Sequence, residues 1–166
     1  MKLSELLEAL SAGEVDYVLV GGLAVQLHGY LRSTFDIDLV LAMNDDNLSR
    51  FIEVAKRFKL VPAIPVPLDS LRDAAQIGQW HRDKGMLAFS LRETAAGGMV
   101  VDVLVRPEID FERLRARAAR GKLFGLQVPV AAIDDLLVMK RAANRGKDRL
   151  DIEALEKIKR GEDPNA

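Results

Sequence analysis

Residues 17–41 read YVLVGGLAVQLHGYLRSTFDIDLVL, and this stretch decides the fold. Its apolar run from Tyr17 to Val20 stops at Gly21-Gly22, as a buried strand followed by a tight turn would. Leu23 to His28 then predicts a short helix that Gly29 closes. Asp36 to Leu41 is rich in apolar residues and predicts the next strand. The stretch therefore predicts a strand–helix–strand unit whose last strand carries two aspartates.

Asp36 and Asp38 are the strongest local signal for chemistry. Residues two apart in a strand share a face, about 6.6 Å apart along the chain. Two neighbouring carboxylates repel each other unless a cation lies between them. Mg²⁺ is commonly held by a few carboxylates together with substrate phosphates. The alternative for this pair alone is a strand end with two solvated aspartates.

Asp102 lies in a second apolar run, Met99 to Val105. An ionised carboxylate is rarely buried in such a run without a partner or a metal. If this strand lies beside the Asp36 strand, three carboxylates converge. They could then hold two metal ions about 3.5–4 Å apart, which suits in-line phosphoryl or nucleotidyl transfer. The alternatives for Asp102 are a salt bridge to an inward arginine or a place at the wet end of the strand.

The rest of the chain mixes helical and strand patterns. Prolines 62, 65 and 67 indicate a loop or a sheet edge. The other elements that we predict are helices from Leu3 to Gly13 and over 47–58, 111–119, 133–143 and 147–159, a helix-like segment over 70–84, and strands over 86–91, 99–105 and 123–130. The order predicts an α+β fold with a mixed sheet and a C-terminal helix pair, in a single domain over residues 1–160 with a disordered tail over 161–166.

Composition sets further bounds on this chain of 166 residues. Its length suits one domain with its own core. The net charge of −1 does not draw the protein to nucleic acid or anionic lipid. The absence of cysteine excludes disulfides and thiolate metal sites. Because neither a signal peptide nor a membrane-length apolar run is visible, we expect a cytoplasmic protein with no membrane contact.

Lys140 shares one helical face with Ile133, Leu136 and Leu137, so it should point inward. An inward lysine either snorkels to the surface or reaches an anion in a cleft. Between residues 140 and 160, eight Lys or Arg stand against four Asp or Glu. That excess indicates either a solvated helix face or a surface for triphosphate or RNA. The arginines at 113, 115, 117 and 120 are expected to form a solvated face.

Several of these residues together resemble a known family. Gly21-Gly22, His28-Gly29, Arg32, Thr34 and Asp36-Ile37-Asp38-Leu39 resemble the signature of the DNA polymerase beta-like nucleotidyltransferase superfamily. Its small bacterial members are the most similar: the AbiEii-type toxin nucleotidyltransferases and the minimal or antibiotic-modifying nucleotidyltransferases. The resemblance spans roughly residues 15–155 and includes Asp102, the run Asp135 to Lys140, and Arg145, Lys147, Asp148 and Asp151.

The resemblance implies a nucleotidyltransferase fold, with a twisted mixed sheet flanked by helices. It implies that Asp36, Asp38 and Asp102 bind Mg²⁺ (or Mn²⁺), with Asp102 also placed to help deprotonate the acceptor. Gly21 and Gly22 would lie against the nucleotide, because bare backbone at a helix start suits phosphate. Arg32, Thr34 and Lys140 complete the expected nucleotide-binding set, although Arg32 alone could equally be an exposed loop arginine. One departure stands out, since many members have Ser where this chain has Gly22.

The expected function is therefore a metal-dependent nucleotidyltransferase that moves an NMP from an NTP to a hydroxyl. The acceptor could be a tRNA end, a partner protein or a small molecule, and a toxin–antitoxin system is one setting. The alternative is a non-catalytic nucleotidyltransferase-fold binding module or antitoxin. The intact carboxylate trio favours the enzyme, because a binding module has no need to keep three repelling acids together.

Overall fold

The computed structural model describes residues 1–166, and its strands form one seven-stranded sheet. The elements in chain order are α1 (Leu3–Ala12), β1 (Tyr17–Val20), α2 (Gly21–Leu27), β2 (Asp36–Leu41), α3 (Asp45–Arg57), β3 (Val61–Pro62), η1 (Leu68–Arg72), α4 (Ala74–Lys84), β4 (Ala88–Arg92), β5 (Val100–Leu104), α5 (Phe111–Arg117), β6 (Ala119–Leu123), β7 (Leu126–Val130), α6 (Ile133–Ala143), η2 (Gly146–Asp148) and α7 (Arg149–Lys159). This architecture confirms the predicted α+β class with a mixed sheet and a C-terminal helix pair.

The strand order is β3-β4-β5-β2-β1-β7-β6, which puts β2 near the middle of the sheet. β2 runs parallel to β5 on one side and antiparallel to β1 on the other. The remaining antiparallel pairs are β3–β4, β4–β5 and β6–β7, whereas β1 and β7 are parallel. Because β2 and β5 are direct neighbours, their aspartates can meet, which confirms the strand pairing that the sequence left conditional.

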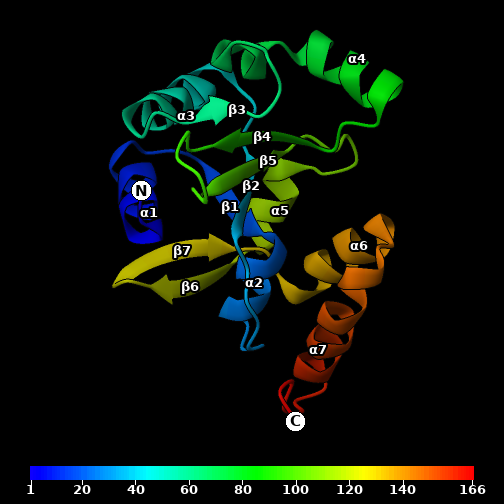
Figure 1. The fold of residues 1–166 in the computed structure, drawn as a ribbon. Coiled ribbons are helices and arrows are strands. Elements are labelled where there is room, and N and C mark those ends of the chain that lie inside the picture. Colours follow the sequence, from blue (N-terminus) through cyan, green and yellow to red (C-terminus); the bar gives the residue numbers. More distant parts are fainter.

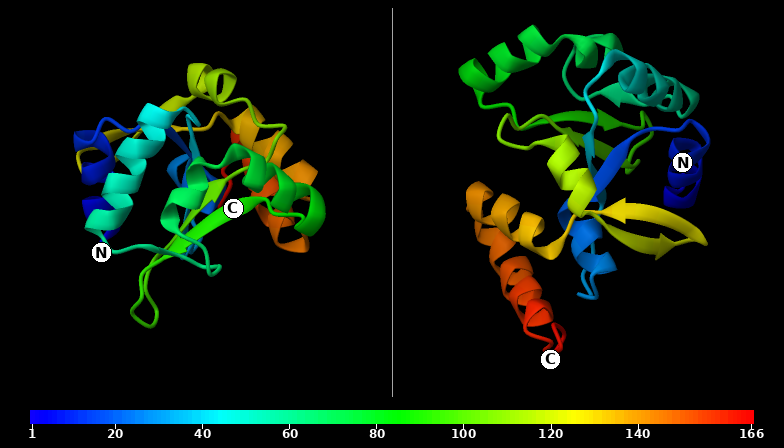
Figure 2. Two further views of the ribbon diagram at one scale, coloured as in Figure 1. Left: turned by 90° about the horizontal axis from the view of Figure 1, so that it is seen from above. Right: turned by 180° about the vertical axis from the view of Figure 1, so that it is seen from behind.

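The helices pack around the sheet in separate groups (Figure 1). α1 contacts α3 and β7, and α5 contacts β1. α6 and α7 form a pair beside α2, apart from the α3–η1–α4 group at the opposite end of the view. The β6–β7 hairpin projects away from the α6–α7 pair (Figure 2). One cluster of 34 buried apolar residues forms the core, and all four residues of β1 belong to it.

Two sequence predictions need correction. The segment 123–130 was predicted as one strand, but the chain turns at Phe124 and Gly125 to form the hairpin of β6 and β7. Both turn residues have positive φ, which suits a two-residue hairpin turn. Arg120, expected on a solvated face, therefore lies on β6, where it is exposed. β6 escaped notice because it is an edge strand with little apolar pattern.

The predicted helix over 70–84 is also divided. Residues Leu68–Arg72 form a short 3-10 helix, and α4 begins at Ala74. The Asp73 side chain accepts a hydrogen bond from the Gln76 backbone N–H, which caps α4 and marks the break.

Residues 161–166, for which we predicted disorder, lie against the loop after α2. The Asn165 side chain donates to the Gly29 carbonyl at 3.0 Å and accepts from the Leu31 N–H at 2.8 Å. No helix combines the length and the apolar composition needed to cross a membrane.

Asn47 holds α3 to the sheet, and its removal should destabilise the fold. Its fully buried side chain donates to the Asp16 and Ala42 carbonyls and accepts from the Asp16 N–H. Asn47→Ala leaves these backbone groups without partners and should lower the free energy of unfolding by about 2–4 kcal/mol. Urea denaturation measures this, with Ser49→Ala as a control, because the hydrogen bonds of this hydroxyl lie at the surface and their loss should change the free energy of unfolding by less than about 1 kcal/mol. Equal effects of the two variants would contradict the role given to Asn47.

Candidate active site

The turn between β1 and α2 brings the backbone close to Asp38. Val20 pairs with Asp38 across the antiparallel strands, and Gly21 follows at once with a φ of +67°. A Cβ atom on Gly21 would overlap the Asp38 carboxylate. Glycine is therefore required here twice, for its backbone conformation and for the close approach of the carboxylate.

Asp38 and Asp102 lie opposite each other on the parallel strands β2 and β5. Asp36 lies two residues earlier, pairs with Val100, and is exposed at the start of β2. The partly buried Asp38 and Asp102 therefore form the centre of the site, and Asp36 lies at its rim.

Ser90 is a site residue that the sequence analysis missed. It pairs with Asp102 across β4 and β5, and its hydroxyl donates to Asp102 Oδ1 at 2.5 Å. Its neighbours Phe89 and Leu91 are fully buried on the other face of the sheet. The alternation of buried and polar residues along β4 could have placed Ser90 on the site face, but not beside Asp102.

The paired carboxylates create an electrostatic cost. Burial, followed by the negative charges of Asp102 and Asp36, raises the pKa of Asp38 to about 7, against an opposing effect of Lys140. A carboxylate that resists ionisation for these reasons is suited to a cation. As the side chains stand, however, no group of three or more His, Cys, Asp or Glu residues is arranged to hold a metal ion.

Lys140 points inward, as predicted, and its charge is paired within the chain. Its Nζ lies 2.9 Å from Asp151 Oδ2 and 3.3 Å from Asp148 Oδ1. Arg32 also pairs with Asp151, and Arg145 Nε lies 2.8 Å from Asp148 Oδ2. The network joins the loop before β2 to the C-terminal helix pair.

The network also acts on Asp148 itself. Burial opposes its ionisation, but the hydrogen bond from Arg145 and the charge of Lys140 together hold the pKa of Asp148 below its ordinary value. Asp148 therefore stays ionised and keeps both cations in place.

Gly22 lies under the loop that carries Arg32 and Thr34. A Cβ atom on this buried glycine would come within 3.0 Å of Thr34 Oγ1 and 3.1 Å of Arg32 Cζ. A serine here, as in many relatives of the resembled family, would press on these two side chains. Glycine at this position thus allows the Arg32 and Thr34 side chains to lie close to the α2 backbone.

All eight predicted site residues line one small cavity of about 160 Å³, and none of its lining residues is apolar. The complete lining is Gly21, Gly22, Arg32, Thr34, Asp36, Asp38, Asp102, Lys140, Arg145, Lys147, Asp148 and Asp151. His28, part of the same sequence signature, lies outside it, and its ring Nε2 is 2.8 Å from the Ala131 carbonyl oxygen. His28 thus links α2 to the segment after β7.

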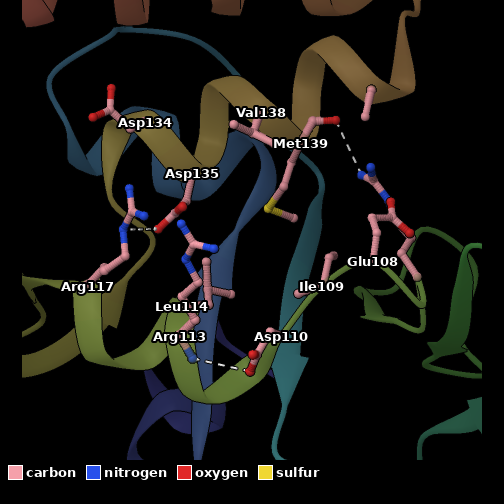
Figure 3. A pocket seen from close by; sticks show the side chains of 12 residues that line it. Glu108, Ile109, Asp110, Arg113, Leu114, Arg117, Asp134, Asp135, Val138 and Met139 are labelled. Carbon is pink, nitrogen blue, oxygen red and sulfur yellow. Dashed lines mark hydrogen bonds and ion pairs between the residues drawn. The ribbon is translucent and has the colours of Figure 1, made fainter.

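A larger cavity of about 450 Å³ lies between α5 and α6, away from the carboxylates (Figure 3). Arg117 Nε approaches Asp135 Oδ2 at 3.3 Å, and Asp110 caps α5 by accepting from the Arg113 N–H. Two of the arginines expected on a solvated face thus line this cavity.

Neither a family model nor a curated protein matches this chain. Solved structures do match it over nearly its whole length. The lincosamide antibiotic adenylyltransferase LnuA, bound to lincomycin, superposes with a TM-score of 0.61 and 16% identity, over 95% of this chain and 98% of that one. ANT(2″)-Ia in complex with adenylyl-2″-tobramycin superposes with a TM-score of 0.59 and 14% identity, over 96% of this chain and 87% of that one.

A candidate nucleotidyltransferase from Thermotoga maritima gives a TM-score of 0.58 and 15% identity, over 96% of this chain and 91% of that one. At such low identity the similarity establishes the fold alone. The chain therefore adopts the nucleotidyltransferase fold, as the sequence resemblance implied.

Replacing Asp38 should stabilise the metal-free protein in a pH-dependent way. The unfolded chain releases this proton near pH 3.8 and the folded protein near pH 7, so ionisation opposes folding increasingly across that window and fully above it. In EDTA at pH 8, Asp38→Asn should raise the free energy of unfolding by about 1–3 kcal/mol, and the gain should vanish near pH 4. Urea denaturation at several pH values measures it.

Asp83 is exposed, and Asp83→Asn is the matched control for this experiment. Its free energy of unfolding should stay within about 0.5 kcal/mol of that of the native protein at every pH. A loss of stability in Asp38→Asn at pH 8 would contradict the repulsion inferred between the carboxylates.

Proposed function

We propose that this protein is a metal-dependent nucleotidyltransferase that moves a nucleoside monophosphate from an NTP to a hydroxyl acceptor. The observation that carries the proposal is the pairing of Asp38 with Asp102 in register across two parallel strands, inside a wholly polar cavity. A protein that only binds a partner has no need for two partly buried, repelling carboxylates, because each opposes folding.

Asp36, Asp38 and Asp102 would hold Mg²⁺ or Mn²⁺. Hard divalent cations take carboxylate oxygens, and a cation would offset the repulsion that raises the pKa of Asp38. The three side chains would have to turn toward a common point, since they are not gathered around one as they stand. When bound, such ions neutralise phosphate charge and favour ionisation of a coordinated hydroxyl.

The charge of the cavity makes nucleotide binding depend on the metal. Its lining carries four cations and five carboxylates, a net charge of −1 when all are ionised. Three of the cations, Arg32, Lys140 and Arg145, are already paired with Asp148 or Asp151. A polyanionic triphosphate is therefore repelled unless divalent cations enter with it.

The chain's own residues would then position the nucleotide. Gly21 and Gly22 have no side chains to keep phosphates from the backbone. Arg32 and Thr34 lie directly over Gly22, with Lys140 on the same cavity wall. These three would contact phosphate oxygens, while the Asp148 and Asp151 pairs hold the cations in place.

Asp102 would accept the proton of the acceptor hydroxyl, oriented by the hydrogen bond from Ser90. The acceptor oxygen forms a bond to the α-phosphorus as the bond from that phosphorus to the bridging oxygen breaks. Pyrophosphate leaves with the electron pair of the broken bond.

The structural neighbours support ATP as the donor, since one is an adenylyltransferase and another is bound to an adenylylated antibiotic. A tRNA end or a partner protein as acceptor, and an AbiEii-like toxin–antitoxin setting, rest on the sequence resemblance. A partner gene adjacent to this one would support that setting.

A non-catalytic binding module or antitoxin is the second candidate, and one observation favours it. Every cation that lines the cavity, apart from Lys147, is paired with an acid of the same chain. Tight NTP binding without transfer to any acceptor would select this candidate.

Metal binding should depend on the β2 aspartates. Calorimetry with Mn²⁺ and a non-hydrolysable NTP should give a binding signal for the native protein and none for the double variant Asp36→Asn/Asp38→Asn, which loses two of the three proposed ligands. Asp45→Asn/Asp46→Asn, a pair of exposed aspartates at the start of α3, is the matched control and should bind normally. Undiminished binding by the β2 variant would place the metal elsewhere.

Turnover should depend on Asp102 much more than nucleotide affinity does. Asp102→Asn should slow transfer from α-labelled ATP about 10²–10⁴-fold, because proton acceptance matters in the transition state, while NTP affinity changes only a few-fold. Ser90→Ala should lie between this variant and the native protein, since it only orients the carboxylate. Acceptors to assay are bulk tRNA, candidate partner proteins and aminoglycoside or lincosamide panels. Native-like transfer by Asp102→Asn would refute the mechanism.

A further inference from the structure

A second cavity, of about 320 Å³, adjoins the polar one and shares its two central carboxylates. The residues common to both cavities are Gly21, Asp38, Asp102, Lys140 and Arg145. Six of the twelve residues that line the second cavity are apolar, namely Leu87, Ala88, Leu104, Leu136, Met139 and Ala143. They come from the segment entering β4, the end of β5, and α6. We call this space the mixed cavity.

The two cavities differ in the chemistry that they can hold. The polar cavity has no apolar lining residue and suits the phosphates of the donor. The mixed cavity takes apolar residues from two parts of the fold, Leu87 and Leu104 from the sheet and Met139 and Ala143 from α6 and its end. Asp102 lies on the boundary between the cavities, so a hydroxyl at Asp102 directs the rest of its molecule into the mixed cavity.

Arg106 contributes the third cation to the lining of the mixed cavity, beside Lys140 and Arg145. Its Nε lies 2.6 Å from Glu108 Oε1, and its guanidinium donates to the Met139 carbonyl at 3.3 Å. Arg106 and Met139 also line the larger cavity between α5 and α6, so the two spaces adjoin at these residues. At this end the lining of the mixed cavity thus supplies a guanidinium that is already paired with Glu108, and no carboxylate of its own.

The lining is unfavourable for the two most charged kinds of acceptor. A polyamine would find no acidic residue in the mixed cavity except Asp38 and Asp102. A nucleic acid needs unpaired cations along its backbone, but Lys140 and Arg145 are paired with Asp148 and Asp151. The cavity volume is at the lower end of small-molecule sites.

From this lining we infer that the acceptor is a small, uncharged, hydroxylated molecule with an apolar body, which packs against Leu87, Leu104 and Met139 while its hydroxyl meets Asp102. The inference rests on the proposed function and names its acceptor class. In the transfer step the acceptor oxygen bonds to the α-phosphorus, pyrophosphate leaves with the electron pair, and the hydroxyl proton passes to Asp102.

A homologous series of alkyl glucosides tests the apolar contact. Methyl, butyl and hexyl β-D-glucoside carry the same neutral hydroxyls and differ only in the apolar chain. Affinity, from titrations followed by methyl NMR, should rise up to about fourfold for each added CH₂ that is buried, the factor equivalent to about 0.8 kcal/mol. Each titration is made with and without Mg²⁺ and a non-hydrolysable ATP analogue.

A matched pair of variants tests the location. Leu87 and Leu150 are both exposed leucines, 47% and 63% accessible, but only Leu87 lines the mixed cavity. Leu87→Glu should abolish the dependence on chain length, because it places a charge against the apolar chain. Leu150→Glu, on α7, should keep it. Circular dichroism and binding of the ATP analogue show whether each variant is folded.

Three results would overturn the inference: an affinity independent of chain length, tighter binding of the polyamine kanamycin than of hexyl glucoside, or transfer of label to bulk tRNA that hexyl glucoside does not inhibit. Label transfer from α-labelled ATP to the hexyl glucoside supports it. Failure of the ATP analogue to bind with Mg²⁺ would instead refute the proposed function, and the nucleotide-free titrations would still decide whether the mixed cavity prefers an apolar chain.

Discussion

The repulsion between Asp38 and Asp102 is the constraint around which the rest of this structure is arranged. Strand pairing puts the two residues at the same level of adjacent parallel strands, and neither backbone position can shift without disrupting the sheet. Burial and the neighbouring charges raise the pKa of Asp38 accordingly. A folded protein retains such an arrangement when a bound group offsets its cost, which is why the pair indicates a site more strongly than either residue does.

The residues around the two carboxylates accommodate them at two distances. Close to the pair, Ser90 donates to Asp102, and Gly21 leaves space for Asp38. Farther out, buried Lys140 is held between Asp148 and Asp151. Buried ion pairs often add little to stability, because desolvation offsets their attraction, but they fix geometry. Here they fix the C-terminal helix pair against the loop that carries Arg32, so the helix pair forms part of the site.

The position of the carboxylates also separates two environments. On one side lies a cavity with only polar lining, and on the other a cavity that is half apolar. The proposed transfer would use this division, with the donor in one cavity and the acceptor in the other, so that the two meet at the carboxylates. Helix α6 contributes to both cavities, because Lys140 lines both of them and Leu136 and Met139 line the mixed cavity.

The sequence by itself determined the local elements and the residue types of the site. Strands β1, β2 and β5, the bounds of α6 and the two glycines follow from periodicity and turn chemistry, which depend on neighbouring residues. The edge strand β6 could not be predicted from periodicity, because an exposed edge strand needs no apolar pattern. The resemblance to nucleotidyltransferases supplied the fold, which the structural neighbours bear out.

Only the tertiary structure decided which charges meet. Strand order and register place Asp102 opposite Asp38, although the two residues are more than 60 positions apart in the chain. The pairing of β4 with β5 places Asp102 beside Ser90. That Lys140 is paired with Asp148 and Asp151 depends on how α7 packs on α6. Such contacts arise from long-range packing of the whole chain, and no local pattern of residue types encodes them.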